Sequence, residues 1–219
     1  MLARLVVDAD PAAALAGVLA RRLRFGTDPV RLLLSPAPEL LPAWDHLASA
    51  PVAWERVTVW PTDAPVVSEA HPAWGWSRLW GHLAVPATFT AIAVDPVADR
   101  DGERAAARLA SMIAEPPCRG VVDHAVLRLG PAGEVAALVP DSPALRERRE
   151  AVAVLRGDGL VHVTVTLPTL ARARALSVLA VGSACRAAVA ALLAGDARLP
   201  AGRLRHPDFT IYADPAAAG

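Results

Sequence analysis

The chain has 219 residues, enough for one large domain or two small ones with a sizeable buried core. Hydrophobic residues make up 54% of it, and 22 basic residues balance 22 acidic ones, so no excess charge favours nucleic acid or an anionic membrane as partner. Its apolar stretches are broken by polar residues well before the roughly 20 residues that cross a bilayer, so we expect no transmembrane helix.

The residue types that are missing narrow the chemistry. The sequence contains no Lys, Asn or Gln, and all its basic residues are Arg, which excludes a Lys Schiff base and a P-loop lysine. The two cysteines, Cys118 and Cys185, have neither metal-ligand spacing nor a disulfide framework, as is usual in a reducing cytoplasm. The N-terminus lacks the pattern of a signal peptide. We therefore expect a cytoplasmic protein without metal or cofactor.

The predicted elements alternate between short apolar strands and amphipathic helices. A first strand at residues 5–8 leads to a helix that Asp10 can cap and Pro11 can open. Further helices are expected at residues 39–48, at 102–114 with Asp101 as cap, and at 183–193, and further strands at 30–34, 57–60, 121–129, 161–166, 176–181 and 209–212. The alternation predicts an α/β fold, a mostly parallel Rossmann-like sheet flanked by helices, in one domain over residues 1–219.

In an open sheet of this kind, ligands bind beyond the carboxyl ends of the strands. The loops after Leu34, Trp60 and Leu129 should therefore meet at one cleft. The third loop carries the most informative motif, L-G-P-A-G-E-V-A-A-L-V-P from Leu129 to Pro140.

This motif resembles the signature G-M-G-P-D-G-H-T-A-S-L-F-P of 6-phosphogluconolactonases and of the related glucosamine-6-phosphate deaminases. Segments 50–57, 162–168, 182–186 and 209–217 are similar, in the same order, to the family's A-P-L-D-W-S-R-V, R-I-T-L-T-L-P, G-A-A-K-R and V-x-W-Y-x-D-x-A-A. The chain is identified as a divergent member of that family. The resemblance implies a 6-phosphogluconolactonase-like fold, a hydrolase ancestry in carbohydrate metabolism and the pentose phosphate pathway, and a sugar phosphate or sugar lactone as ligand.

The residues that carry the family's chemistry are replaced. In those enzymes the loop's His is a general base, whereas here Glu134 stands at its position and Ala132 replaces the Asp. Residues 35–39, S-P-A-P-E, stand where the family has the phosphate-binding S-G-G-S-T, and proline has no N–H to donate. The segment 60–65 keeps only Asp63 of F-W-G-D-E-R. We therefore expect lost or much reduced catalysis, and enzyme activity is an open question.

Glu134 and Asp63 remain the candidate catalytic residues. Glu134 can activate water if burial raises its pKa, or it is a solvated Glu in the first turn of a helix. Asp63 can orient a sugar hydroxyl or a base, or it caps a turn. The candidates for binding substrate or phosphate share a place at or near the cleft by the resemblance: Ser35, Arg78, Arg128, Gly130, His162 and Arg186. Arg128 replaces a family glycine and can instead fill the cleft, paired with Glu134 or Asp63.

All six tryptophans lie between residues 44 and 80. Trp54 and Trp60 match aromatic positions of the family and are predicted to be core residues. Trp74, Trp76 and Trp80 occupy a segment that is polar in the family, and such a concentration is typical of an interface with a protein partner or a second copy of the chain. They also suit a second role, covering an emptied cleft.

Three interpretations follow. The chain is a working 6-phosphogluconolactonase that uses Glu134 in place of His, or a non-catalytic binding protein that uses the Trp-rich segment 71–80. The third is a hydrolase or isomerase that acts on a different sugar substrate, with or without a phosphate. The residues favour loss of the lactonase reaction.

Overall fold

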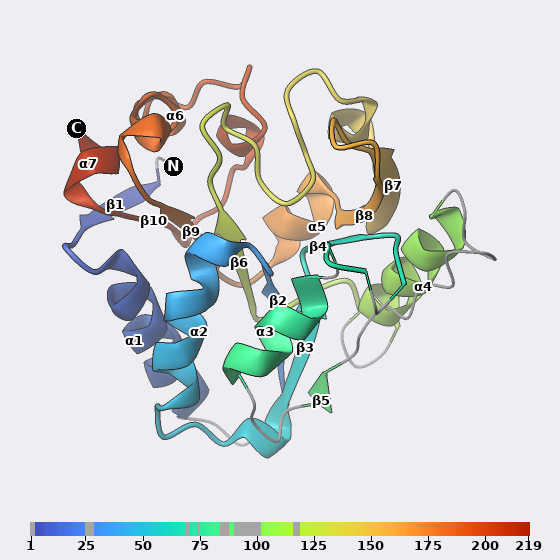
Figure 1. Ribbon diagram of the computed structural model, residues 1–219, viewed down its shortest axis with the longest axis horizontal. Helices are drawn as coiled ribbons and strands as arrows, with labels where there is room; N and C mark the ends of the chain where they lie inside the picture. Colours follow the sequence, from blue (N-terminus) through green and yellow to red (C-terminus); the bar gives the residue numbers. More distant parts are fainter. Residues whose placement is uncertain are drawn as a thin grey trace.

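The computed structural model describes residues 3–24, 29–68, 71–73, 75–83, 88–89, 102–115 and 119–219, without the side chains of residues 75–78 and 88–89. A seven-stranded parallel sheet forms its centre (Figure 1). The strand order is β1 (Arg4–Val7), β10 (Phe209–Ala213), β9 (Leu176–Ala180), β6 (His124–Arg128), β2 (Val30–Leu34), β3 (Val57–Pro61) and β5 (Thr88–Phe89). The mostly parallel α/β sheet that the alternating pattern predicts is confirmed.

The two faces of the sheet carry separate apolar cores, because alternate residues of a strand point to opposite faces. Leu32 and Leu34 belong to one core, together with helices α1 (Pro11–Arg24), α2 (Leu41–Ala48) and α3 (Gly75–Leu83). Leu33, between them, belongs to the other, together with α4 (Glu103–Ala114), α5 (Leu167–Arg172), α6 (Arg186–Leu193) and α7 (Pro215–Ala218). Helices on both faces explain why β9 and β10 are buried along their whole length.

A second, antiparallel sheet packs into the core beside α4. It has the order β4 (Asp63–Pro65), β8 (Val161–Val165) and β7 (Ala151–Leu155), and the sequence analysis predicts only β8. β4 has three residues, one of them proline, and its strand character depends on pairing with β8 far along the chain. β7 and β8 form a hairpin around the turn at residues 156–160.

The helix starts show which local signals were reliable. The carboxylate of Asp10 accepts the N–H of Ala13 at 2.9 Å, so the expected cap of α1 is confirmed. Asp101 lies outside the described residues, and the residue before α4 is Gly102, with φ of 73°. A Cβ atom there would lie 2.9 Å from Val161, so α4 packs too closely on the second sheet for any larger residue.

Two of the expected helices begin with a turn of 3₁₀-helix. Pro38–Leu40 precedes α2, and Ser183–Cys185 precedes α6. Three further 3₁₀ turns lie at Trp54–Arg56, Pro143–Arg146 and Ala201–Arg203. Trp54 and Trp60 are buried, as expected. Within the described residues, no helix is both long and apolar enough to cross a membrane.

Candidate functional site

A cleft of about 290 Å³ lies where β2, β3 and β6 end. The loop after β2 contributes residues 35–39, β4 contributes Asp63 and Pro65, and Arg128 and Ala136 come from the end of β6 and the loop that follows it. The three loops that the sequence analysis places together thus do line one cleft. The β7–β8 hairpin completes the wall with Arg156 and His162.

The loop after β2 offers few donors to a ligand. The buried Ser35 hydroxyl accepts the N–H of Ala37 at 3.3 Å, and the Ser35 N–H donates to the Val126 carbonyl. Pro36 and Pro38 have no N–H. The glycine-type anion cradle, in which several N–H groups point at one phosphate, is therefore absent from this loop.

Arg128 is held between two carboxylates. Its Nη1 lies 3.7 Å from Glu39 Oε1, and its Nη2 lies 3.5 Å from Glu134 Oε1. The pairing of Arg128 with Glu134 that the sequence analysis considers is confirmed, and Glu39 is a second partner. The positive charge that would attract a phosphate is therefore already neutralised from both sides.

The Glu134 side chain binds the backbone of its own loop. Its Oε2 accepts the N–H of Ala132 at 2.9 Å, and its side chain, only 15% exposed, folds back over Gly130. A Cβ atom on Gly130 would lie 1.8 Å from Glu134 Oε1, so a side chain at position 130 would force the Glu134 carboxylate to move. The alternative of a solvated Glu at a helix start is wrong, because residues 135–138 form a tight turn closed by the Val135–Leu138 bridge.

Asp63 and His162 face the cleft from neighbouring strands. In the β4–β8 ladder Asp63 lies opposite Thr164, which places it diagonally from His162 on the same face. Burial raises the pKa of Asp63, opposed by the Thr62 hydroxyl, which donates to Asp63 Oδ1 at 2.9 Å. Burial also lowers the pKa of His162, opposed by the negative charges of Asp63 and Asp158. His162 is therefore a neutral imidazole near pH 7.

The His162 ring is poorly satisfied. Its Nε2 lies 3.4 Å from Asp158 Oδ2, but the geometry is not that of a hydrogen bond, and both ring nitrogens are buried without a hydrogen-bond partner in the structure. A buried ring nitrogen without a partner costs free energy, and a ligand hydroxyl in the cleft can recover it. The imidazole is thus available for binding or for proton transfer.

Arg156 is the cleft residue that sequence reasoning misses. It precedes Gly157-Asp158-Gly159 in the β7–β8 turn, and no ion pair or side-chain hydrogen bond is formed by its guanidinium among the described residues. An Asp-Gly turn between two apolar runs is typical of a hairpin, so the sequence could have located this turn. That Arg156 lies near β4 depends on the tertiary structure.

The other predicted site residues lie elsewhere or outside the described side chains. Arg186 donates from Nε and Nη2 to the Ala216 carbonyl, both at 3.2 Å, and it is not among the residues that line the cleft. The side chains of Arg78 and Trp76, and all of Trp74, lie outside the described part of the structure. Trp80 is 52% exposed on α3. Within the described residues, no group of three or more acidic, His or Cys side chains is arranged to hold a metal.

The contact between Gly130 and Glu134 makes a prediction about stability. We expect Gly130→Ala to lower the free energy of unfolding by about 1–3 kcal/mol, because the new methyl group displaces the Glu134 carboxylate from the Ala132 N–H and from Arg128. Adding Glu134→Ala should remove most of this loss, since it removes the colliding atoms. Urea unfolding of the two single variants and the double variant measures the coupling. Gly157→Ala, where a Cβ meets nothing within 4 Å, is the control. Purely additive effects at 130 and 134 would contradict the contact.

Comparison with known proteins identifies the fold and the family. The family description "Glucosamine-6-phosphate isomerases/6-phosphogluconolactonase" matches residues 26–212. The 6-phosphogluconolactonase of Shewanella baltica OS155 superposes with a TM-score of 0.81 at 18% identity, over 98% of this chain and 97% of that one. The 6-phosphogluconolactonase of Trypanosoma brucei gives 0.81 at 17%, over 99% and 97%.

A monomeric glucosamine-6-phosphate deaminase gives a TM-score of 0.80 at 17% identity, over 100% of this chain and 99% of that one. No curated protein sequence matches. The two enzyme types share one fold, and the identities are too low to carry an activity across. The chain belongs to the glucosamine-6-phosphate isomerase/6-phosphogluconolactonase family.

Proposed function

We propose that this chain is a 6-phosphogluconolactonase-like protein whose lactonase activity is lost or greatly reduced. The observation that carries the proposal is that Arg128 and Glu134 pair with each other and that Glu134 also binds the backbone of its own loop. Lactone hydrolysis needs a group that holds the phosphate, a base that activates water and donors for the developing oxyanion. The first two requirements meet obstacles in this cleft.

The phosphate anchor is the first obstacle. Arg128 lies between Glu39 and Glu134, so an incoming phosphate dianion must displace two carboxylates and meets their repulsion. The loop beside it has prolines at 36 and 38. Poor anchoring forfeits much of the rate advantage that comes from correct positioning.

The base is the second obstacle. The Glu134 carboxylate already has partners at both oxygens, since Oε2 accepts the Ala132 N–H and Oε1 pairs with Arg128. Its side chain bends back over Gly130 instead of extending into the cleft. Glu134 therefore serves the loop conformation.

We predict that the purified protein hydrolyses 6-phosphogluconolactone no faster than the spontaneous reaction. Loss of a general base alone costs about 10²–10⁴-fold in rate, and loss of the anchor adds to it. The measurement follows acid release from the lactone with wild type, Glu134→Ala and Glu134→His, beside a motif-complete lactonase as positive control. Robust wild-type turnover that collapses in Glu134→Ala would show that Glu134 replaces the histidine and would overturn the proposal.

Asp63 and His162 favour a second candidate, hydrolysis of an unphosphorylated sugar lactone. Neutral His162 takes a proton from water as the water oxygen attacks the lactone carbonyl, and the adjacent Asp63 carboxylate stabilises the imidazolium. The ring C–O bond then breaks, and the proton returns to the leaving alkoxide. Arg156 lines the same cleft and supplies positive charge for the oxyanion. This candidate needs no phosphate anchor.

For this candidate, we predict that glucono-δ-lactone hydrolysis above the blank falls by about 10²–10⁴-fold in His162→Gln. The rate should fall as the pH drops below the ordinary His value, because burial lowers the His162 pKa and the base is active only when deprotonated. Asp158→Asn should shift this acid limb to lower pH, since the Asp158 charge raises the His162 pKa. Wild-type rates equal to the blank, or a pH profile unmoved in Asp158→Asn, would reject it.

Exposed Trp80 supports a role as a binding protein. We propose that the partner is a second copy of the chain. At 52% exposure, Trp80 leaves much of its large apolar ring in water on α3, and such rings are enriched at the centres of interfaces.

We predict that wild type sediments as a reversible dimer and that Trp80→Ser weakens the dimer by at least about tenfold, the loss expected for one central aromatic anchor. Leu155→Ser removes another exposed apolar side chain and should leave it unchanged. A monomeric wild type, or equal loss in both variants, would rule out this interface.

A further inference from the structure

A second concave site, the basic groove, lies outside the cleft. It has a volume of about 500 Å³ and is lined by four arginines, Arg146, Arg148, Arg203 and Arg205. Two come from the segment around the 3₁₀ turn Pro143–Arg146, and two from the end of the 3₁₀ turn Ala201–Arg203 and beyond. None of these residues lines the cleft.

The single carboxylate that lines the groove is already neutralised. Glu147 accepts the backbone N–H groups of Arg148 and Arg149 at 2.7 and 2.9 Å, and it forms a two-pronged ion pair with the Arg149 side chain at 3.0 and 2.8 Å. These contacts lower the pKa of Glu147 to about 2. Arg149 also pairs with Glu103 on α4. Glu147 therefore fixes the loop without balancing the groove's charge.

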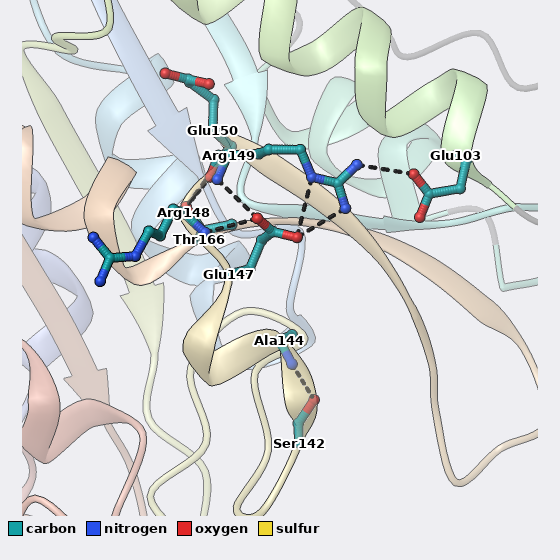
Figure 2. A network of polar contacts seen from close by, with 8 residues as sticks. All are labelled: Glu103, Ser142, Ala144, Glu147, Arg148, Arg149, Glu150 and Thr166. Atoms are coloured by element: carbon teal, nitrogen blue, oxygen red, sulfur yellow. Dashed lines mark hydrogen bonds and ion pairs between the residues drawn. The ribbon is translucent and has the colours of Figure 1, made fainter.

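In Figure 2 the guanidinium of Arg148 points away from Glu147 and Arg149. Among the described residues, the side chains of Arg146 and Arg148 form no ion pair or hydrogen bond. Asp141 lies in an adjoining hollow that shares Arg146 and Arg203 with the groove. One exposed carboxylate against four guanidinium groups leaves a net positive charge.

Arg203 and Arg205 are held in place by neutral groups. Arg203 Nε donates to the Ala197 carbonyl at 2.9 Å, and Arg205 donates to the Gly202 and Gly195 carbonyls at 2.9 and 3.2 Å. Carbonyl oxygens fix the guanidinium planes but leave their full charge. An anion that binds there meets donors already oriented, so little side-chain entropy is lost.

The remaining residues that line the groove with Glu147 are Leu145, Leu167, Pro168 and Ala171, so it has no aromatic ring on which a base can stack. Four like charges in one hollow also destabilise the folded chain when no anion is present.

We propose that the basic groove binds a small polyanion, a molecule with two or more phosphate or carboxylate groups. Each arginine can form a two-pronged pair with one such group. A chain with zero formal net charge and a groove of this size is a poor match for a long nucleic acid.

Isothermal titration calorimetry with inorganic pyrophosphate tests the proposal. Wild type should give a saturable one-to-one isotherm that weakens as salt rises. The double variant Arg146→Ser/Arg148→Ser should weaken binding by at least about tenfold, because it removes two charge-assisted contacts. These two side chains are exposed and form no ion pair or hydrogen bond within the described residues, so we expect the variant to keep the fold, which its thermal unfolding checks. A second titration with citrate shows whether the groove prefers carboxylate or phosphate groups.

Two control variants locate the binding. Arg21→Ser/Arg104→Ser removes two exposed charges on α1 and α4, and Arg156→Ser removes the cationic side chain of the cleft. Both should bind pyrophosphate within about twofold of wild type, since neither touches the groove. Absence of saturable binding by both anions overturns the proposal. So does an equal loss in the Arg21/Arg104 control, which indicates diffuse attraction, or a loss in Arg156→Ser, which places the ligand in the cleft.

Discussion

The ion-paired triad of Glu39, Arg128 and Glu134 is the constraint on which the cleft depends. Arg128 stands at the end of β6, Glu39 in the loop after β2 and Glu134 in the loop after β6, so the triad ties neighbouring loops together. The triad is partly buried, where ion pairs are screened less than on the open surface. Removing Arg128 would leave the Glu39 and Glu134 carboxylates without this shared partner. The triad therefore holds the two loops against the end of β6.

The second sheet brings titratable groups to the wall of the cleft. β4 is short, yet its pairing with β8 carries Asp63 to the same wall as His162, and the β7–β8 turn adds Arg156. The burial that this packing imposes raises the pKa of one group and lowers that of the other. Two titratable groups whose pKa values are moved towards each other by burial are a frequent property of functional sites, although structural networks also produce it.

The position of each arginine in the fold decides what its charge does. The chain is neutral overall, but its cations are all arginine, and arginine serves three different purposes in the structure. Arg128 neutralises carboxylates, Arg149 fixes a loop through Glu147 and Glu103, and the arginines of the basic groove leave their charge uncompensated. The planar guanidinium makes each of these possible, because its donors act in pairs and its charge persists at every physiological pH.

The sequence by itself determined the parallel sheet, most of its strands and the meeting of three loops, because apolar periodicity and helix caps are local signals. It also located the replaced family residues at 132 and 134, and it left open whether Arg128 pairs with Glu134 or with Asp63. It did not reveal β4, β7 or Arg156, since a three-residue strand with a proline acquires its structure from a partner about 100 residues away. Nor did it reveal that Glu134 folds over Gly130 or that four arginines from two distant segments share a groove. Those features depend on which surfaces the packed core brings together, and only the tertiary structure decides that.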